Sequence, residues 1–156
     1  MVSIRPKTIV TTTVRAVGTS HARSDITVRD VSSIIDEPEE RGGSNTGPSP
    51  TETTLAGLAG CTNVIAHKCA KALGIDIGHL DITVAARFDR RGVTLTEEFD
   101  LPFPEIDVTV MADGPVSDAD LQRVAEEVGK FCPVSKLFKA AGTKITETWK
   151  SNSHQS

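Results

Sequence analysis

The residues best suited to chemistry in this sequence are three cysteines, Cys61, Cys69 and Cys132. Cys61 and Cys69 stand eight positions apart in one predicted helix, which separates them by about 12 Å along its axis. A disulfide requires Cα atoms within about 7 Å, so these two cannot pair with each other. Cys132 precedes Pro133 at the start of a second predicted helix, where free amide groups favour a thiolate. We therefore expect Cys132 to be the more acidic thiol, and Cys132-Pro-Val-Ser135 has the spacing of a CPxS redox motif.

Three interpretations of these cysteines remain open from the residues alone. Free cysteines are usually small core hydrophobes, and an odd number without a secretory signal argues against a disulfide framework. Metal binding is disfavoured because His67 lies about 120° from Cys61 around the helix and the sequence contains no C-x-x-C motif. We expect no metal site and no cofactor, which leaves core packing or thiol redox chemistry.

The helix that carries Cys61 is the clearest element of the sequence. Ser49 is suited to cap it, Pro50 to its first position, and Glu52 completes an S-x-x-E capping box. The pattern runs over 50–73 and is apolar nearly all round, which predicts burial on most faces. Its interior glycines, Gly57 and Gly60, favour the close approach of another backbone.

The remaining elements predict an α+β fold in which antiparallel sheet surrounds this buried central helix. Alternating β-branched and apolar residues indicate strands, and amphipathic spacing after Ser117 indicates a second helix. The expected strands are 8–17, 25–35, 80–88, 106–110 and 144–150, with helices at 118–128 and from 133, and a loop at 36–49. The length of 156 residues predicts one domain, 1–156.

Composition narrows the function classes. A net charge of −4, with scattered lysines and arginines, disfavours nucleic-acid binding. No segment has the roughly 20 apolar residues of a membrane span, and the first residues lack the apolar run of a signal peptide. We therefore expect a cytoplasmic protein that does not bind a membrane. Five Phe, one Trp and no Tyr leave a core of aliphatic residues, or a core shared with a partner.

The run GGSNTGPSPTETTLAGLAGCTNVIAHK, followed some seventy residues later by FCPVSKLF, resembles the OsmC/Ohr family of osmotically induced and organic hydroperoxide resistance proteins. The resemblance implies an intertwined homodimer, cofactor-free, that detoxifies organic hydroperoxides in the oxidative stress response. It implies that Cys61 attacks the hydroperoxide and becomes a sulfenic acid, which condenses with Cys132. A dithiol, in some members a lipoylated protein, then reduces the disulfide.

The resemblance also implies an arginine that activates the thiolate and a glutamate at the start of the central helix. Arg23 is the best match for the arginine, ahead of Arg15 and Arg41, and its other interpretation is a solvated turn charge. Glu52 is one residue displaced from the family position, which Thr51 holds. It lies about 13 Å along the axis from Cys61, so it would act across a dimer interface or serve only as a cap.

Two other functions compete with the peroxidase. One is a non-enzymatic dimeric binding protein that holds an apolar ligand in an interface pocket. The other is a thiol transferase that uses Cys132 alone.

Overall fold

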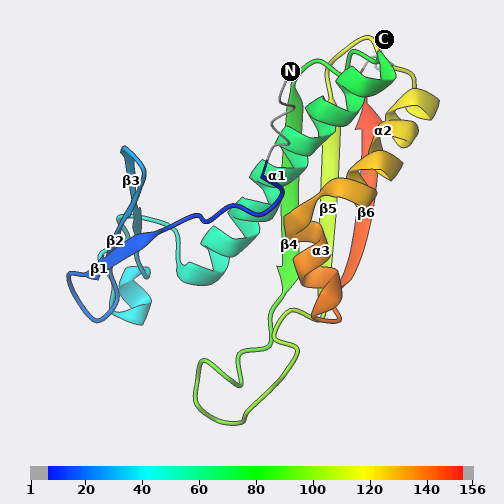
Figure 1. Cartoon of the computed structure of the whole chain (residues 1–156). Coiled ribbons are helices and arrows are strands. Elements are labelled where there is room, and N and C mark those ends of the chain that lie inside the picture. Colours follow the sequence, from blue (N-terminus) through cyan, green and yellow to red (C-terminus); the bar gives the residue numbers. More distant parts are fainter. Residues whose placement is uncertain (1–6, 153–156) are drawn as a thin grey trace. The chain divides into compact units, whose positions relative to one another are not determined.

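The computed structural model describes residues 7–152. Its contacts divide the chain into two compact units, with the boundary between Thr53 and Thr54; Figure 1 shows the elements of both. Among the described residues, none of the helices combines the length and apolar character that a membrane span requires.

The first unit contains an antiparallel sheet of three short strands, β1 (Arg15–Gly18), β2 (Ser24–Val28) and β3 (Val31–Ile35). The prediction of two strands was wrong in two respects. Residues 8–14 form no strand, and the run 25–35 is a hairpin whose two-residue turn is Arg29–Asp30. Arg29 adopts a left-handed φ of 54°. No glycine marks this turn, so the sequence lacked the usual hairpin signal.

The loop after β3 is organised by one buried carboxylate, Asp36, which has no exposed surface. It accepts hydrogen bonds from the amide of Glu37 at 2.9 Å, and from the amide and hydroxyl of Ser44 at 3.1 and 2.7 Å. The amide and hydroxyl of Thr46 donate to it at 3.0 and 2.8 Å. The loop also contains the short helix η1 (Glu39–Arg41). A single side chain thus fixes the backbone that leads to the first long helix.

That helix, α1 (Pro50–Leu73), has the predicted bounds. The capping box is confirmed, because the Ser49 amide donates to Glu52 Oε2 at 2.8 Å and the Glu52 amide donates to Ser49 Oγ at 3.4 Å. Gly74 follows with a left-handed φ of 69°, as a helix-ending glycine requires.

The second unit is built on a three-stranded sheet of order β4 (Leu80–Arg87), β5 (Glu105–Ala112), β6 (Lys144–Ser151). β4 and β5 are antiparallel, but β5 and β6 are parallel, so the expectation of a wholly antiparallel sheet was wrong for this pair. The connection from β5 to β6 contains two helices, α2 (Asp118–Phe131) and α3 (Pro133–Ala140). A helical crossover of this length returns the chain to the same end of the sheet, which permits parallel pairing.

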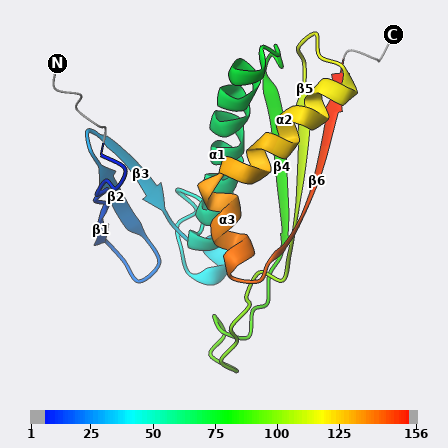
Figure 2. The ribbon, with the colours of Figure 1, turned by 45° about the vertical axis from the view of Figure 1, so that its right-hand side comes forward.

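The three helices lie on one face of this sheet, and the core fills the space between them (Figures 1 and 2). α1 is buried along one side only. Its buried residues are Leu58, Thr62, Ala66, Cys69 and Ala70. On the opposite side Val64 is 51% exposed, and a Cβ placed at Gly57 or Gly60 would meet no described atom within 4 Å. Within the second unit, the small-residue side of α1 is therefore open.

Candidate active site

The second unit brings together the two sulfurs that the sequence analysis singled out. Cys132 Sγ lies 3.3 Å from Cys61 Sγ, and both cysteines are free thiols. A disulfide bond is about 2.05 Å long, so an approach of little more than 1 Å would join them. Two residues that are remote in the sequence are thus in position for thiol–disulfide chemistry.

Cys132 is held at the junction of two helices. Its amide donates to the carbonyl of Val128 at 2.9 Å, which ends α2, and its sulfur accepts from the amide of Ser135 at 3.5 Å, which begins α3. Pro133 supplies the fixed φ that suits the first position of α3. Cys132 is the C-cap of α2 and the N-cap of α3, so both helices fix the position of its sulfur.

The pKa of Cys132 differs from the expectation drawn from sequence. Burial raises the pKa of this thiol, and the hydrogen bond and charge of Cys61 add to the rise. The amides of Ser135 and Val134 oppose this shift but do not overcome it. The expectation that the helix start favours the thiolate of Cys132 was therefore wrong, because a cysteine with no exposed surface loses more solvation than two amides return. Which of Cys61 and Cys132 is the more acidic thiol stays a prediction.

Cys61 differs from Cys132 in its access to solvent. It is partly exposed, whereas Cys132 is fully enclosed. At 100° per residue, Cys61 lies about 60° around the helix from Val64 and from Leu58. It therefore stands at the border between the open side and the packed side of α1. A molecule approaching from outside meets Cys61 first.

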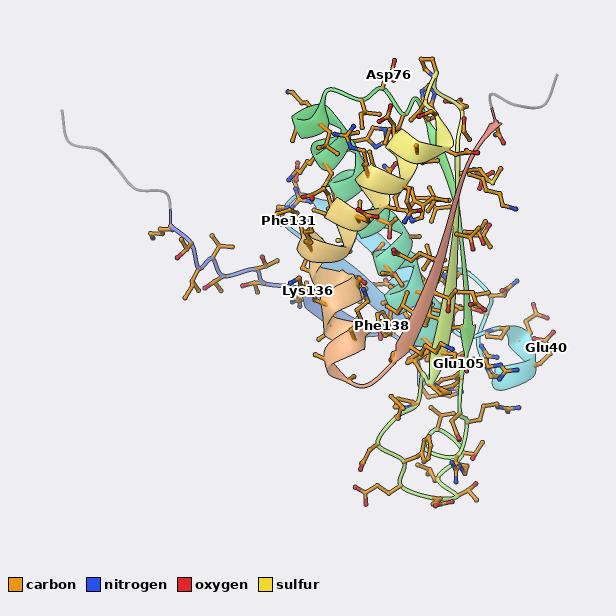
Figure 3. All side chains as sticks on the ribbon, turned by 90° about the vertical axis from the view of Figure 1, so that its right-hand side faces the viewer. Glu40, Asp76, Glu105, Phe131, Lys136 and Phe138 are labelled. Atoms are coloured by element: carbon orange, nitrogen blue, oxygen red, sulfur yellow. The ribbon has the colours of Figure 1, made fainter. Side chains whose placement is uncertain are left out.

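The third cysteine contributes to a separate apolar groove. Cys69 is buried, and burial raises its pKa. It lines a groove of about 330 Å³ together with Ile65, Ala72, Leu73 and Phe131. Figure 3 shows Phe131 at the end of α2, on the side that faces away from the sheet. Ile65 is four residues from both cysteines of α1, so the groove begins one turn beyond Cys61.

Arg23 lies in the first unit, at the end of the turn before β2. Its Nε donates to Asp25 at 2.8 Å, and its Nη1 donates to the Thr46 hydroxyl at 3.4 Å. The hydrogen bond to Asp25 is the main cause of its raised pKa, so the guanidinium is charged. Thr46 is in turn fixed by Asp36, a residue that sequence reasoning missed. The available signal was an acid followed by hydroxyl residues in a glycine-rich loop.

Glu52 also belongs to the first unit and caps α1. Its hydrogen bonds with the amide and hydroxyl of Ser49 lower its pKa. The carboxylate is exposed and ionised, its described hydrogen bonds are those of the capping box, and the charge of Arg41 also favours its ionised form. The structure thus brings together Cys61 and Cys132, and gives Arg23 and Glu52 local partners in the other unit.

Residues 42–148 match the family described as OsmC-like protein. No curated protein matches the chain. Three of the similar solved structures illustrate the fold.

The OsmC-like protein from Mycoplasma pneumoniae is 21% identical with a TM-score of 0.76, covering 90% of this chain and 96% of its own. The organic hydroperoxide resistance protein OsmC from Legionella pneumophila is 16% identical with a TM-score of 0.69, covering 92% and 99%. The organic hydroperoxide resistance protein OhrB of Bacillus subtilis is 22% identical with a TM-score of 0.64, covering 90% and 98%. These likenesses show the α+β fold, and together with the family match they establish that the chain belongs to the OsmC-like protein family.

Proposed function

We propose that this protein is a thiol-dependent peroxidase that reduces organic hydroperoxides, with Cys61 as the nucleophile and Cys132 as the resolving thiol. The observation that carries the proposal is the 3.3 Å separation of the two sulfurs, one accessible and the other enclosed. The accessible thiol reacts with the substrate, and the enclosed thiol then lies beside the sulfenic acid of Cys61. The names of the solved relatives support this activity.

The cycle has three steps. The Cys61 thiolate attacks one peroxide oxygen and breaks the O–O bond, giving a sulfenic acid and, after protonation, an alcohol. The Cys132 sulfur then attacks the Cys61 sulfur, so that a disulfide forms and water leaves. A dithiol finally reduces this disulfide by exchange and becomes a disulfide itself. We propose a small dithiol or a lipoylated protein as that reductant.

The second element of the proposal concerns the charged residues. Arg23 is proposed to stabilise the Cys61 thiolate, since a nearby cation favours the charged form of a thiol. Its hydrogen bonds to Asp25 and Thr46 support a fixed orientation for the guanidinium. Glu52 is proposed to act with it from the start of α1, in addition to capping the helix. Both assignments rest on the family resemblance.

The groove that begins one helical turn beyond Cys61 supports an organic substrate. Its lining is almost wholly apolar, with Lys68 and Glu127 as the charged members. An alkyl or aryl group bound there gains from leaving water, and hydrogen peroxide has no such group. We therefore propose that apolar hydroperoxides are consumed faster than hydrogen peroxide.

We propose that the active protein is a cytoplasmic homodimer. The open side of α1, with Gly57, Gly60 and the exposed Val64, supports the packing of a second copy against this helix. Small residues allow two helices to approach closely, and covering Val64 removes apolar surface from water.

Thiol counting with cumene hydroperoxide tests the peroxidase. The reduced protein should lose two thiols per chain in one turnover and gain an intramolecular disulfide between Cys61 and Cys132. Cys61→Ser should abolish hydroperoxide consumption. Cys132→Ser should lose one thiol and accumulate a sulfenic acid that a cyclic 1,3-dione traps. Retained turnover in Cys61→Ser would refute the assignment, and Cys69→Ser is the matched control.

The apolar groove also favours a second candidate, a binding protein that holds an apolar ligand without catalysis. Mass spectrometry of the purified protein would then find a bound apolar molecule, and no hydroperoxide would be consumed. The thiol transferase that uses Cys132 alone has less support, because this sulfur has no exposed surface and a raised pKa.

A further inference from the structure

A buried hydroxyl beside the reactive sulfurs has no hydrogen-bond partner. Ser135 is 2% exposed, and within residues 7–152 its Oγ has no partner for either its proton or its lone pairs. Burying a hydroxyl in this way costs free energy, and native structures seldom leave such groups unpaired. The hydroxyl therefore does not stabilise the reduced fold.

The same residue already touches the reactive sulfur through its backbone. The Ser135 amide lies 3.5 Å from Cys132 Sγ, in the first turn of α3. Three bonds separate that amide nitrogen from Oγ, and rotation about the Cα–Cβ bond moves the hydroxyl between staggered positions. The unpaired hydroxyl is thus attached to the backbone group that holds the resolving thiol.

The resolving step has a proton to move. Because burial raises the pKa of Cys132, this residue enters the step as a neutral thiol. Its proton must leave as the sulfur attacks, while the oxygen leaving Cys61 needs a proton to depart as water. Cys61 is the titratable side chain in contact with this sulfur, and Lys130 and Lys136, which flank Cys132 in sequence, are exposed. A neutral hydroxyl that can donate and accept suits this transfer.

We propose that the Ser135 hydroxyl relays the Cys132 proton to the oxygen that leaves the Cys61 sulfenic acid. The proposal rests on the proposed function. The electron pair of Cys132 Sγ forms the S–S bond, and the S–O bond of Cys61 breaks with its pair on oxygen. The thiol proton passes to Ser135 Oγ, whose own proton passes to the departing oxygen, so water leaves and the hydroxyl is restored. One sulfur is oxidised and the other reduced, with no added reactant.

Single-turnover kinetics of Ser135→Ala separate this role from a structural one. The variant keeps the backbone amide and removes the hydroxyl. Formation of the sulfenic acid should keep the wild-type rate, whereas disulfide formation should slow by about 100-fold, within the range of general acid–base contributions. The melting temperature should be unchanged or higher, because an unpaired buried hydroxyl is lost.

The pH profile of disulfide formation supplies a second readout. With the relay, the neutral thiol reacts and the rate below the Cys132 pKa should change little with pH. Without the relay only the thiolate attacks, so the rate of disulfide formation in Ser135→Ala should rise about tenfold per pH unit in the same range. Ser135→Thr, which keeps a hydroxyl, should recover most of the rate.

Thr62→Val is the matched control, because it removes a buried hydroxyl that is already paired with the Leu58 carbonyl at 2.8 Å. It should leave the rate of disulfide formation within about threefold of wild type. Wild-type disulfide formation in Ser135→Ala would overturn the relay alone. Equal slowing of both steps together with a lower melting temperature would assign Ser135 a structural role instead. If the wild-type protein loses no thiols to cumene hydroperoxide, the proposed function and the relay both fail.

Discussion

The carboxylate of Glu52 has two roles to distinguish, capping and catalysis. Its Oε2 accepts from the Ser49 amide at 2.8 Å, and alanine would leave that amide unpaired. Glu52→Ala should therefore lower stability by about 1 kcal/mol, or about 2–4 °C in melting temperature. Glu52→Gln keeps an acceptor, so it should lower the melting temperature less than Glu52→Ala but reduce hydroperoxide turnover through the lost charge. Wild-type turnover in Glu52→Gln would show that this residue is only a cap.

Asp36 gives the loop before α1 a dependence on pH. Its hydrogen bonds, led by that of the Ser44 hydroxyl, hold its pKa well below the usual range. Because the pKa in the folded state lies below the unfolded-state value of about 3.9, the ionised carboxylate stabilises the fold above that pH. This stabilisation is lost as the pH falls toward the folded-state pKa. Asp36→Asn should therefore speed amide hydrogen exchange over residues 36–49 at pH 7, and this difference should narrow progressively below about pH 4. If Asp36→Asn speeds exchange equally at pH 7 and below about pH 4, the ionised carboxylate is not what holds the loop.

Cys132 shows what a single residue reveals before a structure is known. The cysteines were evident from their type, but the direction of the Cys132 pKa shift depended on burial. Its position at a helix start predicted a lower pKa, and its complete enclosure reversed the direction. Local sequence describes the neighbours along the chain, whereas desolvation comes from segments packed against it from elsewhere.

At the scale of elements, the strongest local signals gave the most accurate predictions. The capping box and Gly74 placed both ends of α1 correctly, and Ser117 caps α2 as expected by accepting from the Asp120 amide at 3.1 Å. The parallel pairing of β6 with β5 was missed. Alternation along a strand identifies its buried face but contains nothing about the direction of its neighbour.

The edge strand β6 places a carboxylate on the helix-covered face of its sheet. Glu147 alternates with Ile145 and Trp149 on that face, and burial raises its pKa although Lys139 opposes the shift. Because the pKa of Glu147 is higher in the folded state than in the unfolded state, where it is about 4.3, its protonated form favours folding below that pH. This contribution to stability is lost as the pH rises through the folded-state pKa. Glu147→Gln should therefore raise the melting temperature at pH 7 by a few degrees.

The same substitution should have almost no effect at pH 4, because the wild-type carboxyl is then mostly protonated in the fold. Differential scanning calorimetry at the two pH values measures the difference. Glu126→Gln, at an exposed position of α2, is the matched control. A stabilisation by Glu147→Gln that is equal at both pH values would arise from packing and not from charge.

At the scale of the whole molecule, the α+β class followed from the order of elements, and the pairing of Cys61 with Cys132 came only from the family resemblance. Periodicity places each cysteine on its element but does not say which elements meet. The contact forms because α1 and the α2–α3 junction cover the same face of the sheet. That the chain is one domain over 1–156 stays a prediction, and a single calorimetric transition would support it.

The open side of α1 makes the final prediction one of assembly. Gly57, Gly60 and Val64 recur at helical spacing on this side, and Val64 is 51% exposed. If a second copy packs there, Val64→Arg would bury an unpaired charge against close-packed backbone, which is strongly unfavourable. We expect light scattering to give the mass of a dimer for wild type and of a monomer for Val64→Arg. Thr109→Arg, exposed on the opposite face of the sheet, should remain dimeric. A wild-type protein that is monomeric at micromolar concentration would show that there is no such interface. A dimeric Val64→Arg variant would place the interface elsewhere.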